Sequence, residues 1–209
     1  MKILIVDDHD VIRQSLSLII KNEFPTAVCT KLENANSCIQ LLKKEEFDLL
    51  ILDMNLPDMD GISLTEWILD RYPQQMILIF SMNPTDIFAK RLYQLGIMGY
   101  LNKQADMPEI VKALRTVLVE KRQYFNEEFK AILAQDFLNK NPANPIEKLS
   151  TRELTIAQLL AQGKTNEEIA QQLNIESSTI RTYKARIFQK LDVNTLHEFL
   201  AKAGMYKIV

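Results

Sequence analysis

The sequence contains few cysteines and no long apolar run. Cys29 and Cys38 are its only cysteines among 209 residues, and their spacing fits neither a metal site nor a redox motif. No apolar stretch reaches the roughly 20 residues that a membrane-spanning helix needs. Met1 and Lys2 lead directly into a short strand pattern instead of a targeting segment. These absences argue against a disulfide scaffold and a membrane protein, and we expect a reduced, cytoplasmic chain.

The chain also lacks a strong excess of charge of one sign. Its formal net charge of −2 gives the whole chain no preference for nucleic acid. The distribution is uneven, however, because Ile146–Val209 carries nine basic and seven acidic residues, a net of +2 that leaves −4 for the remainder. A length of 209 residues suits one large or two small domains. The charge asymmetry favours two domains with different tasks.

The stretch Leu49–Gly61, LLILDMNLPDMDG, organises the first half of the chain. Its four leading apolar residues are too few for a helix and predict a strand buried on both faces. The strand ends at Asp53, and turn-forming residues follow before a helical pattern begins. An acid at the carboxyl end of a central parallel strand occupies the place where open α/β sheets bind ligands.

Short apolar strands alternate with helical patterns over the first 120 residues. The predicted strands are Ile3–Val6, Val28–Leu32, Phe47–Leu52, Met76–Phe80 and Met98–Leu101. The predicted helices are Val11–Ile20, Ala35–Leu42, Ile62–Leu69, Ile87–Leu95 and Ile110–Val119. This alternation predicts an α/β fold, a doubly wound five-stranded parallel sheet with right-handed crossovers.

Polar side chains follow four of these strands, namely Asp7 and Asp8, Asp53, Ser81 and Lys103. In a sheet of strand order 2-1-3-4-5 the four strands are neighbours, so their carboxyl ends form one edge. Three crowded carboxylates repel one another, and a hard divalent cation with oxygen ligands relieves that repulsion. With Lys103 facing an incoming anion, the set suits phosphoryl transfer to Asp53.

Each of these residues also has a plain structural interpretation. Asp7 and Asp8 could cap the first helix, Ser81 could be a turn residue, and Lys103 could be a solvated surface charge. The functional interpretation rests on all five residues following the appropriate strands.

Residues 1–120 resemble the receiver domain of bacterial two-component response regulators. The matching motifs are DDH at 7–9 with Arg13, LDMNLPDMDG at 52–61, Ser81, and GYLNK at 99–103. The resemblance implies a flavodoxin-like fold in which Asp53 accepts phosphate from a sensor histidine kinase. It also implies Mg²⁺ bound by Asp8, Asp53 and the Met54 carbonyl, with Asp7 acting through water.

The same resemblance assigns the switch residues. It implies Ser81 as the switch hydroxyl, Tyr100 as the switch aromatic and Lys103 as the phosphate-binding lysine. Tyr100 fits the role of a half-buried strand aromatic equally well. Asn55 and Asn83 stand where the family tunes dephosphorylation.

Residues 121–147 are predicted to link two domains. Phe125, Phe129, Ile132, Leu133 and Phe137 recur at helical spacing, which predicts an amphipathic helix over Asn126–Leu138. Its apolar stripe could dock on either domain or on a second protomer. Asn139–Pro145 breaks any helix and predicts a hinge.

Residues 148–209 contain a tight series of helices. Capping-box patterns at Ser150–Glu153 and Thr165–Glu168 start helices that run to Leu160 and Leu173, and Gly163 stops the first. A third helix spans Ser177–Leu191 and a last one Thr195–Ala203. A short helix, a turn and a longer helix predict an all-α helix-turn-helix domain.

The third helix has the pattern of a DNA-recognition helix. Ile180, Tyr183, Ile187 and Leu191 form its inward stripe, and it carries four basic residues and no acid. The residues proposed to contact double-stranded DNA are Ser178, Thr179, Arg181, Thr182, Lys184, Ala185, Arg186, Gln189 and Lys190. A basic helix face is more often only solvated, and helix-turn-helix shapes also occur in proteins that do not bind DNA.

Residues 148–205 resemble the LuxR-type domain of NarL/FixJ regulators through LSTRELTIAQLLAQGKTNEEIAQQLNIESSTIRTYKARIFQKLDV. Four residues depart from the family pattern. Glu167 replaces a frequent Lys, Glu176 the usual Ser, Tyr183 a common His, and Leu196 a common Arg. The first two place negative charge near DNA, and Glu176 could move the helix cap to Ser177.

We therefore predict a phosphorylation-dependent DNA-binding transcriptional regulator that dimerises on activation. It is not an enzyme beyond self-phosphorylation and autodephosphorylation at Asp53. One alternative is a partner-binding regulator that is never phosphorylated, which the intact Asp7, Asp8 and Asp53 set opposes. Another is an aspartyl-phosphate hydrolase, which needs an acid where this chain has Asn55.

Overall fold

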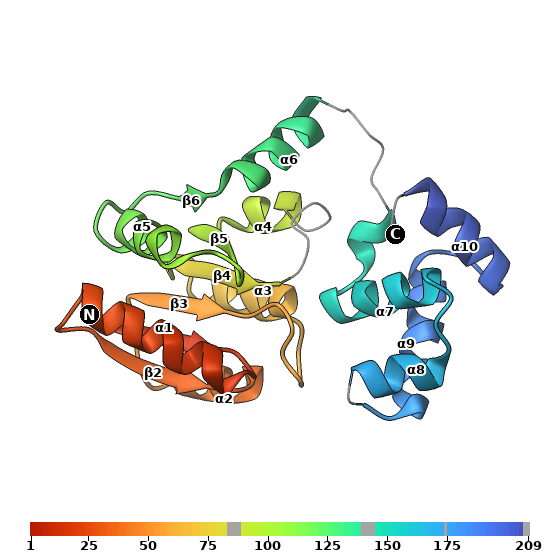
Figure 1. The fold of residues 1–209 in the computed structure, drawn as a ribbon, viewed down its shortest axis with the longest axis horizontal. Coiled ribbons are helices and arrows are strands. Elements are labelled where there is room, and N and C mark those ends of the chain that lie inside the picture. The colour runs from red at the N-terminus through yellow and green to blue at the C-terminus, as the bar shows by residue number, and fades with distance from the viewer. Residues whose placement is uncertain (83–88, 139–144, 174, 207–209) are drawn as a thin grey trace. The chain divides into compact units, whose positions relative to one another are not determined.

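The computed structural model describes residues 1–82, 89–138, 145–173 and 175–206. The chain forms two compact units, Met1–Lys140 and Asn141–Val209 (Figure 1). Within the described ranges, no helix combines the length and apolar character needed to span a membrane.

The first unit is built on a parallel sheet. The strands are β1 (Lys2–Val6), β2 (Val28–Leu32), β3 (Leu49–Leu52), β4 (Ile77–Ser81), β5 (Gly99–Asn102) and β6 (Tyr124–Phe125). Their order is β2-β1-β3-β4-β5-β6. The predicted doubly wound sheet and its strand order are confirmed, but the sheet has six strands instead of five. Strands β1, β3 and β4 are buried on both faces of the sheet, which accounts for their nearly uninterrupted apolar sequences.

Helices cover both faces of this sheet (Figure 1). Helices α1 (Asp10–Glu23) and α5 (Met107–Leu118) pack on one face through a core that includes Leu16, Ile20 and Leu114. Helices α2 (Ala35–Leu42), α3 (Gly61–Arg71) and α4 (Ala89–Leu95) follow β2, β3 and β4 in the chain and belong to the opposite layer. Residues 83–88, which include the start of the predicted fourth helix and Asn83, lie outside the described residues.

The segment after α5 is part of the first unit. The short strand β6 pairs with β5, with Gly99 opposite Tyr124, and α6 (Glu127–Leu138) packs against α4. The predicted helix is therefore present, but Phe125 belongs to the strand before it. A two-residue strand is too short to leave a periodic signal in the sequence. Of the predicted hinge, residues 139–144 lie outside the described residues.

The second unit is helical. It consists of the 3₁₀ turn η1 (Pro145–Lys148), α7 (Thr151–Ala161), α8 (Asn166–Gln172), α9 (Ser177–Lys190) and α10 (Leu196–Met205). Both predicted capping boxes are present, at Ser150 with Glu153 and at Thr165 with Glu168. Gly163 has a φ of +81°, which suits the left-handed residue that follows a helix end. Helices α7, α8 and α9 pack on one another, which confirms the helix-turn-helix prediction.

Gly99 gives a test of the β5–β6 pairing. A Cβ at this position would lie 2.6 Å from the Tyr124 carbonyl oxygen and 2.8 Å from Leu78 Cδ1. We expect Gly99→Ala to lower the free energy of unfolding of the first unit by about 1–3 kcal/mol, because the backbone must shift. Urea unfolding followed by the fluorescence of Trp67, the single tryptophan, measures this. Gly204→Ala on α10, where nothing lies within 4 Å, is the matched control and should leave that transition unchanged.

Candidate functional site: an acidic pocket and a basic helix

Asp53 directly follows β3, at the carboxyl edge of the sheet. The Asp53 N–H donates to the Val6 carbonyl oxygen at 2.9 Å, which fixes the residue beside the end of β1. Its side chain is only 2% exposed. A Cβ on Gly61 would lie 2.6 Å from the Asp53 carbonyl oxygen, so the loop after β3 requires glycine where it returns to start α3. The turn residues of the sequence therefore serve to close this loop tightly against Asp53.

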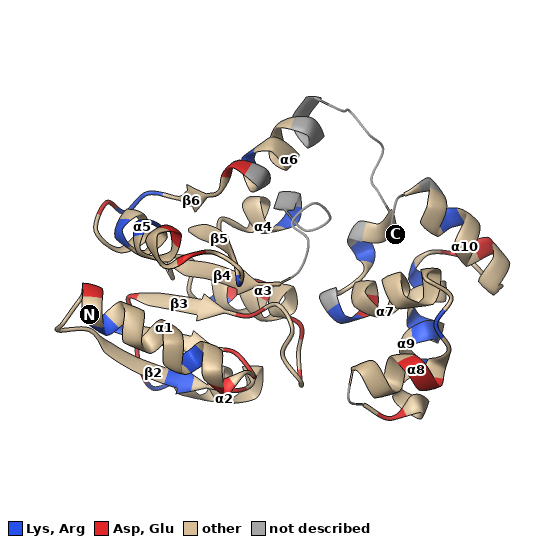
Figure 2. Cartoon of the chain, in the orientation of Figure 1, with Lys and Arg blue, Asp and Glu red and all other residues tan. Residues whose placement is uncertain are grey.

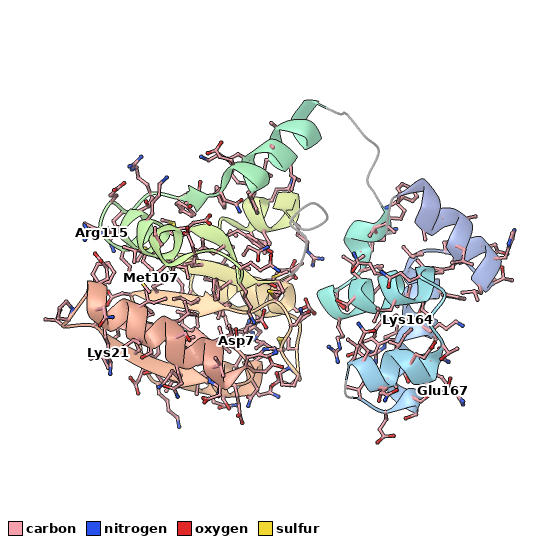
Figure 3. All side chains as sticks on the ribbon, viewed as in Figure 1. Asp7, Lys21, Met107, Arg115, Lys164 and Glu167 are labelled. Atoms are coloured by element: carbon pink, nitrogen blue, oxygen red, sulfur yellow. The ribbon has the colours of Figure 1, made fainter. Side chains whose placement is uncertain are left out.

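Asp7 and Lys103 reach the same point from β1 and from the loop after β5. The Lys103 Nζ atom lies 2.6 Å from Asp7 Oδ2 and 3.0 Å from Asp53 Oδ2. All three side chains are buried, so one ammonium faces two carboxylates in a medium that screens charge poorly. Figure 3 labels Asp7 in the first unit. The predicted convergence of these residues is observed, and the interpretation of Lys103 as a solvated charge is wrong.

Asp8 and His9 form the outer part of the pocket. Asp8 is partly exposed, and its Oδ1 lies 2.6 Å from His9 Nδ1. The N-cap of α1 is His9, without a side-chain cap, and the Asp7 carboxylate accepts the His9 N–H at 2.8 Å. The interpretation of Asp7 and Asp8 as caps of the first helix is therefore wrong, because neither side chain caps α1.

The pocket has the chemistry of a divalent-cation site. Ligand atoms of Asp7, Asp8, His9 and Asp53 all lie within 4.8 Å of one another. Asp53 Oδ1 is buried and accepts no hydrogen bond from the described residues. The Met54 carbonyl accepts the Gly61 N–H at 2.8 Å, which leaves it a second lone pair. Carboxylate and carbonyl oxygens are the ligands that Mg²⁺ prefers, so these residues fit that ion.

Burial sets the electrostatics of Asp53. It raises the pKa of the Asp53 carboxyl above its ordinary value, while the Lys103 ammonium lowers that pKa and the Asp7 carboxylate raises it. The net direction is upward, so ionising Asp53 costs the folded protein free energy. A cation or an arriving group that takes up the negative charge would remove this cost.

Ser81 and Tyr100 lie on the neighbouring strands β4 and β5. Ser81 is fully buried at the end of β4, where its carbonyl accepts the Lys103 N–H at 3.0 Å. Tyr100 is 2% exposed, which is more buried than the half-buried aromatic of the structural interpretation. Its ring stacks on Phe129 of α6 at a centroid distance of 5.5 Å.

The second unit presents the predicted recognition face. On α9, Ile180, Ile187 and the capping Leu191 are fully buried. The residues Ser178, Arg181, Thr182, Ala185, Arg186 and Gln189 are exposed on the opposite side, while Thr179 and Lys184 are partly covered. Figure 2 colours Lys and Arg blue on α9 and the acidic residues of α8 red. The predicted inward stripe is confirmed for Ile180, Ile187 and Leu191, whereas Tyr183 is only partly buried.

Two features at the ends of α9 were not apparent from the sequence. Lys190 contacts Glu153 Oε2 at 2.6 Å, and Glu153 is a buried member of the α7 capping box. Lys190 therefore links α9 to α7, and because it is exposed its contact with DNA stays a prediction. The N-cap of α9 is Glu176, whose side chain makes no cap hydrogen bond, so the cap does not move to Ser177.

Helix α10 has two exposed leucines and one buried phenylalanine among its described side chains. Leu196 and Leu200 are 44% and 41% exposed. Phe199 is fully buried and stacks on Phe188 at 5.5 Å, so it belongs to the core of its own unit. An apolar surface on α10 therefore consists of the two leucines.

Comparison with known families agrees with this geometry. Residues 3–115, more than half of the chain, match the family described as "Response regulator receiver domain". Residues 147–203 match "Bacterial regulatory proteins, luxR family". The chain is a response regulator. It joins a receiver domain to a LuxR-type DNA-binding domain, and the predicted resemblance to NarL/FixJ regulators is confirmed.

Two curated transcription regulators align with nearly the whole chain. A "Putative transcriptional regulator" of Pseudomonas aeruginosa is 32% identical over 208 residues, covering 100% of this chain and 99% of that protein. The "Virulence factors putative positive transcription regulator BvgA" of Bordetella pertussis is 29% identical over 95% of this chain and 94% of its own length. The similarity thus extends over nearly the full length of both relatives.

A solved structure is also similar to nearly the whole chain. RcsB from Salmonella enterica serovar Typhimurium, bound to promoter rprA in the presence of the phosphomimetic BeF3−, is 25% identical to this response regulator. The match covers 97% of each chain with a TM-score of 0.60.

The site predicts a specific response to magnesium. We expect Mg²⁺ at a hundredfold excess over its Kd to stabilise the wild type by about 2.7 kcal/mol, because it binds only the folded pocket. Thermal unfolding with and without MgCl₂, at matched ionic strength, measures the shift. Asp53→Asn should lose most of it. Equal shifts in both proteins would contradict the pocket as the binding site.

The raised pKa of Asp53 predicts a pH dependence. The folded pKa lies above the unfolded value, so stability is highest below the unfolded pKa and falls as the pH rises through the folded pKa. Without Mg²⁺, Asp53→Asn should therefore be more stable than the wild type at pH 7.5, and this difference should shrink towards pH 4. Urea unfolding at a series of pH values tests the sign. A wild type more stable than the variant at pH 7.5 would contradict it.

Proposed function

We propose that this response regulator takes a phosphoryl group from a sensor histidine kinase onto Asp53 and that the modification controls DNA binding by the second unit. The observation that supports this most strongly is the buried Lys103 Nζ atom within 3.0 Å of both Asp7 and Asp53. A merely structural ion pair would need one carboxylate. The second carboxylate, with its unpartnered Oδ1 among the described residues, suits a nucleophile.

The proposed step is an in-line displacement at phosphorus. A carboxylate oxygen of Asp53 attacks the phosphorus of the phosphohistidine, an O–P bond forms, and the N–P bond breaks with its electron pair passing to the histidine nitrogen. Lys103 neutralises negative charge on the transferring group, and Ser81, buried at the neighbouring strand end, is placed to donate its hydroxyl to a phosphoryl oxygen.

Mg²⁺ would be held by Asp8, Asp53 and the Met54 carbonyl, with Asp7 acting through water. When bound, the ion supplies positive charge that balances the phosphoryl oxygens. The residue two positions after the acceptor is Asn55, which has no acidic group. This argues against a hydrolase, because such an enzyme needs an acid at that position to protonate the leaving group of an external substrate. The intact pocket likewise argues against a regulator that is never phosphorylated.

DNA is the proposed target of the exposed face of α9. We assign base contacts to Arg181 and Thr182 and phosphate contacts to Lys184 and Arg186, because these side chains lie on the outer side of the helix. The proposed partner is double-stranded DNA in the cytoplasm, where bacterial chromosomes lie. Lys190, which is exposed and contacts Glu153 of α7, is assigned a phosphate contact as well.

Phosphorylation is tested with acetyl phosphate as the donor. Intact-mass spectrometry should show one added phosphate on the wild type in the presence of Mg²⁺ and none on Asp53→Asn. Omission of Mg²⁺ should abolish labelling, because the charge of the donor is then unbalanced. Equal labelling of wild type and variant would place the acceptor elsewhere.

DNA recognition is tested with two variants of α9. Arg181→Ala should lower the free energy of DNA binding by about 1–3 kcal/mol at one base position, which a binding-site selection detects as a lost base preference. Lys184→Ala should weaken binding to all DNA sequences alike and lower the magnitude of the slope of log K against log salt concentration by about one. An unchanged sequence preference in Arg181→Ala would show that the recognition face is assigned wrongly.

Activation is proposed to favour a homodimer. Leu196 and Leu200 offer an apolar seam on α10, and a symmetric pair of domains would contact half-sites about one helical turn apart. Light scattering with a bound DNA duplex should show two chains per site. Leu200→Lys should lower that mass towards one chain, while its exposed neighbour Ala201→Ser should not. A mass of two chains in Leu200→Lys would exclude this seam.

A further inference from the structure

Four aromatic rings connect the receiver sheet to α6. Leu101 belongs to the core beneath α1 and α5, so the alternation of β5 places Tyr100 on the opposite face. Tyr100 stacks on Phe129 of α6, and Phe129 stacks on Phe125 of β6 at 4.5 Å with an interplanar angle of 6°. Phe125 in turn packs on Tyr93 of α4 at 5.9 Å. We call Tyr100, Phe129, Phe125 and Tyr93 the aromatic stack.

The stack is a buried contact and not a surface feature. Phe129 is fully buried, and Phe125 is buried as well. Only Tyr93, at the end of the stack, is exposed to a substantial degree. Leu133, one turn further along α6, is also buried, and α6 packs on α4. Among the described side chains of α6, Phe129 therefore contacts the receiver between the ring of Tyr100 and the ring of Phe125.

The inner end of the stack is tied to the phosphorylation pocket. Tyr100 precedes Lys103 by three residues on the same strand and loop, and it pairs with Ile79 of β4. Two residues further, Ser81 pairs with Asn102, and the Lys103 N–H donates to the Ser81 carbonyl at 3.0 Å. Lys103 also contacts Asp53. A shift of Ser81 and Lys103 towards a group on Asp53 therefore acts on the strand end that carries Tyr100.

Helix α6, which carries Phe129, is the last described helix before the second unit in the chain. Helix α6 ends at Leu138, and the second unit starts at Asn141. We propose that Phe129 couples the pocket to α6, so that modification of Asp53 changes how firmly α6 is seated on the receiver. The proposal rests on the proposed phosphorylation of Asp53. It assigns Phe129 as a positioning residue, which stacks on Tyr100 and acts through it.

Coupling of this kind is reciprocal. If a ligand at Asp53 changes the seating of α6, then a change in that seating must alter the affinity of the ligand by the same factor. This consequence separates coupling from a purely structural role for Phe129, because a stabilising core residue far from the pocket has no reason to change ligand affinity. The substitution Phe129→Leu removes the ring stacking and keeps an apolar side chain in the site.

The test uses the full-length protein with Mg²⁺ and beryllofluoride as a stand-in for the phosphoryl group. Beryllofluoride is titrated into the protein, and the bound form is quantified by ¹⁹F NMR. Hydrogen exchange is measured for the amides of residues 129–134 with and without the ligand. Phe47→Leu is the matched control, because Phe47 is a buried phenylalanine of the same unit outside the stack. Urea unfolding confirms that both variants remain folded under the conditions used.

In the wild type, beryllofluoride should change the exchange of the α6 amides. In Phe129→Leu that change in exchange should disappear, and the beryllofluoride concentration that half-saturates the protein should differ from the wild-type value by roughly fivefold or more. Phe47→Leu should match the wild type in both measurements. Unchanged α6 exchange in the wild type, or equal half-saturation in all three proteins, would overturn the coupling while leaving phosphorylation intact. Failure of the wild type to bind beryllofluoride would instead overturn the proposed function itself.

Discussion

One buried ammonium is shared by two buried carboxylates in the receiver of this response regulator. Lys103 contacts Asp7 and Asp53, yet a single positive charge cannot balance both acids in a poorly solvated pocket. Burial raises the pKa of the Asp53 carboxyl, the Lys103 ammonium lowers it and the Asp7 carboxylate raises it, so that the net direction is upward. One oxygen of Asp53 also has no hydrogen-bond partner among the described residues. A cation in the pocket would relieve the remaining negative charge.

The rest of the receiver holds this imbalance in place. Asp7, Asp53 and Lys103 come from three strand ends that the sheet order brings together, and the glycine at position 61 lets the loop close behind Asp53. Strand β5 connects this pocket to α6, because it contains Tyr100 and is followed directly by Lys103. Tyr100 lies under α6, the last element before the second unit. The second unit has a core of its own, with Phe199 and Ile187 fully buried. The proposed effect of phosphorylation on this unit is therefore regulatory and does not require a change in its core.

The sequence predicted those parts of the structure that depend on local pattern. Uninterrupted apolar runs such as Leu49–Leu52 identified the buried strands, and the acids after them identified the pocket. Capping boxes at Ser150 and Thr165 located helix starts because the pattern acts within four residues. The predictions failed where a long-range contact decides the outcome. Nothing local shows that Lys190 pairs with Glu153, 37 residues away, or that Tyr124 and Phe125 add a strand to the sheet. The burial of Phe199 follows from its contact with Phe188, which the helical spacing of α10 leaves undetermined.

The central claim is that modification of Asp53 governs the access of α9 to DNA. Its most direct test is the DNA affinity of the full-length chain before and after phosphorylation, measured on a duplex obtained by binding-site selection. Asp53→Asn, treated identically, is the control, and a 146–209 fragment gives the affinity of the second unit alone. We expect phosphorylation to tighten DNA binding by the wild type only, and the fragment to bind at least as tightly as the unphosphorylated chain. A fragment that binds more weakly, together with a wild-type affinity that phosphate does not change, would contradict it.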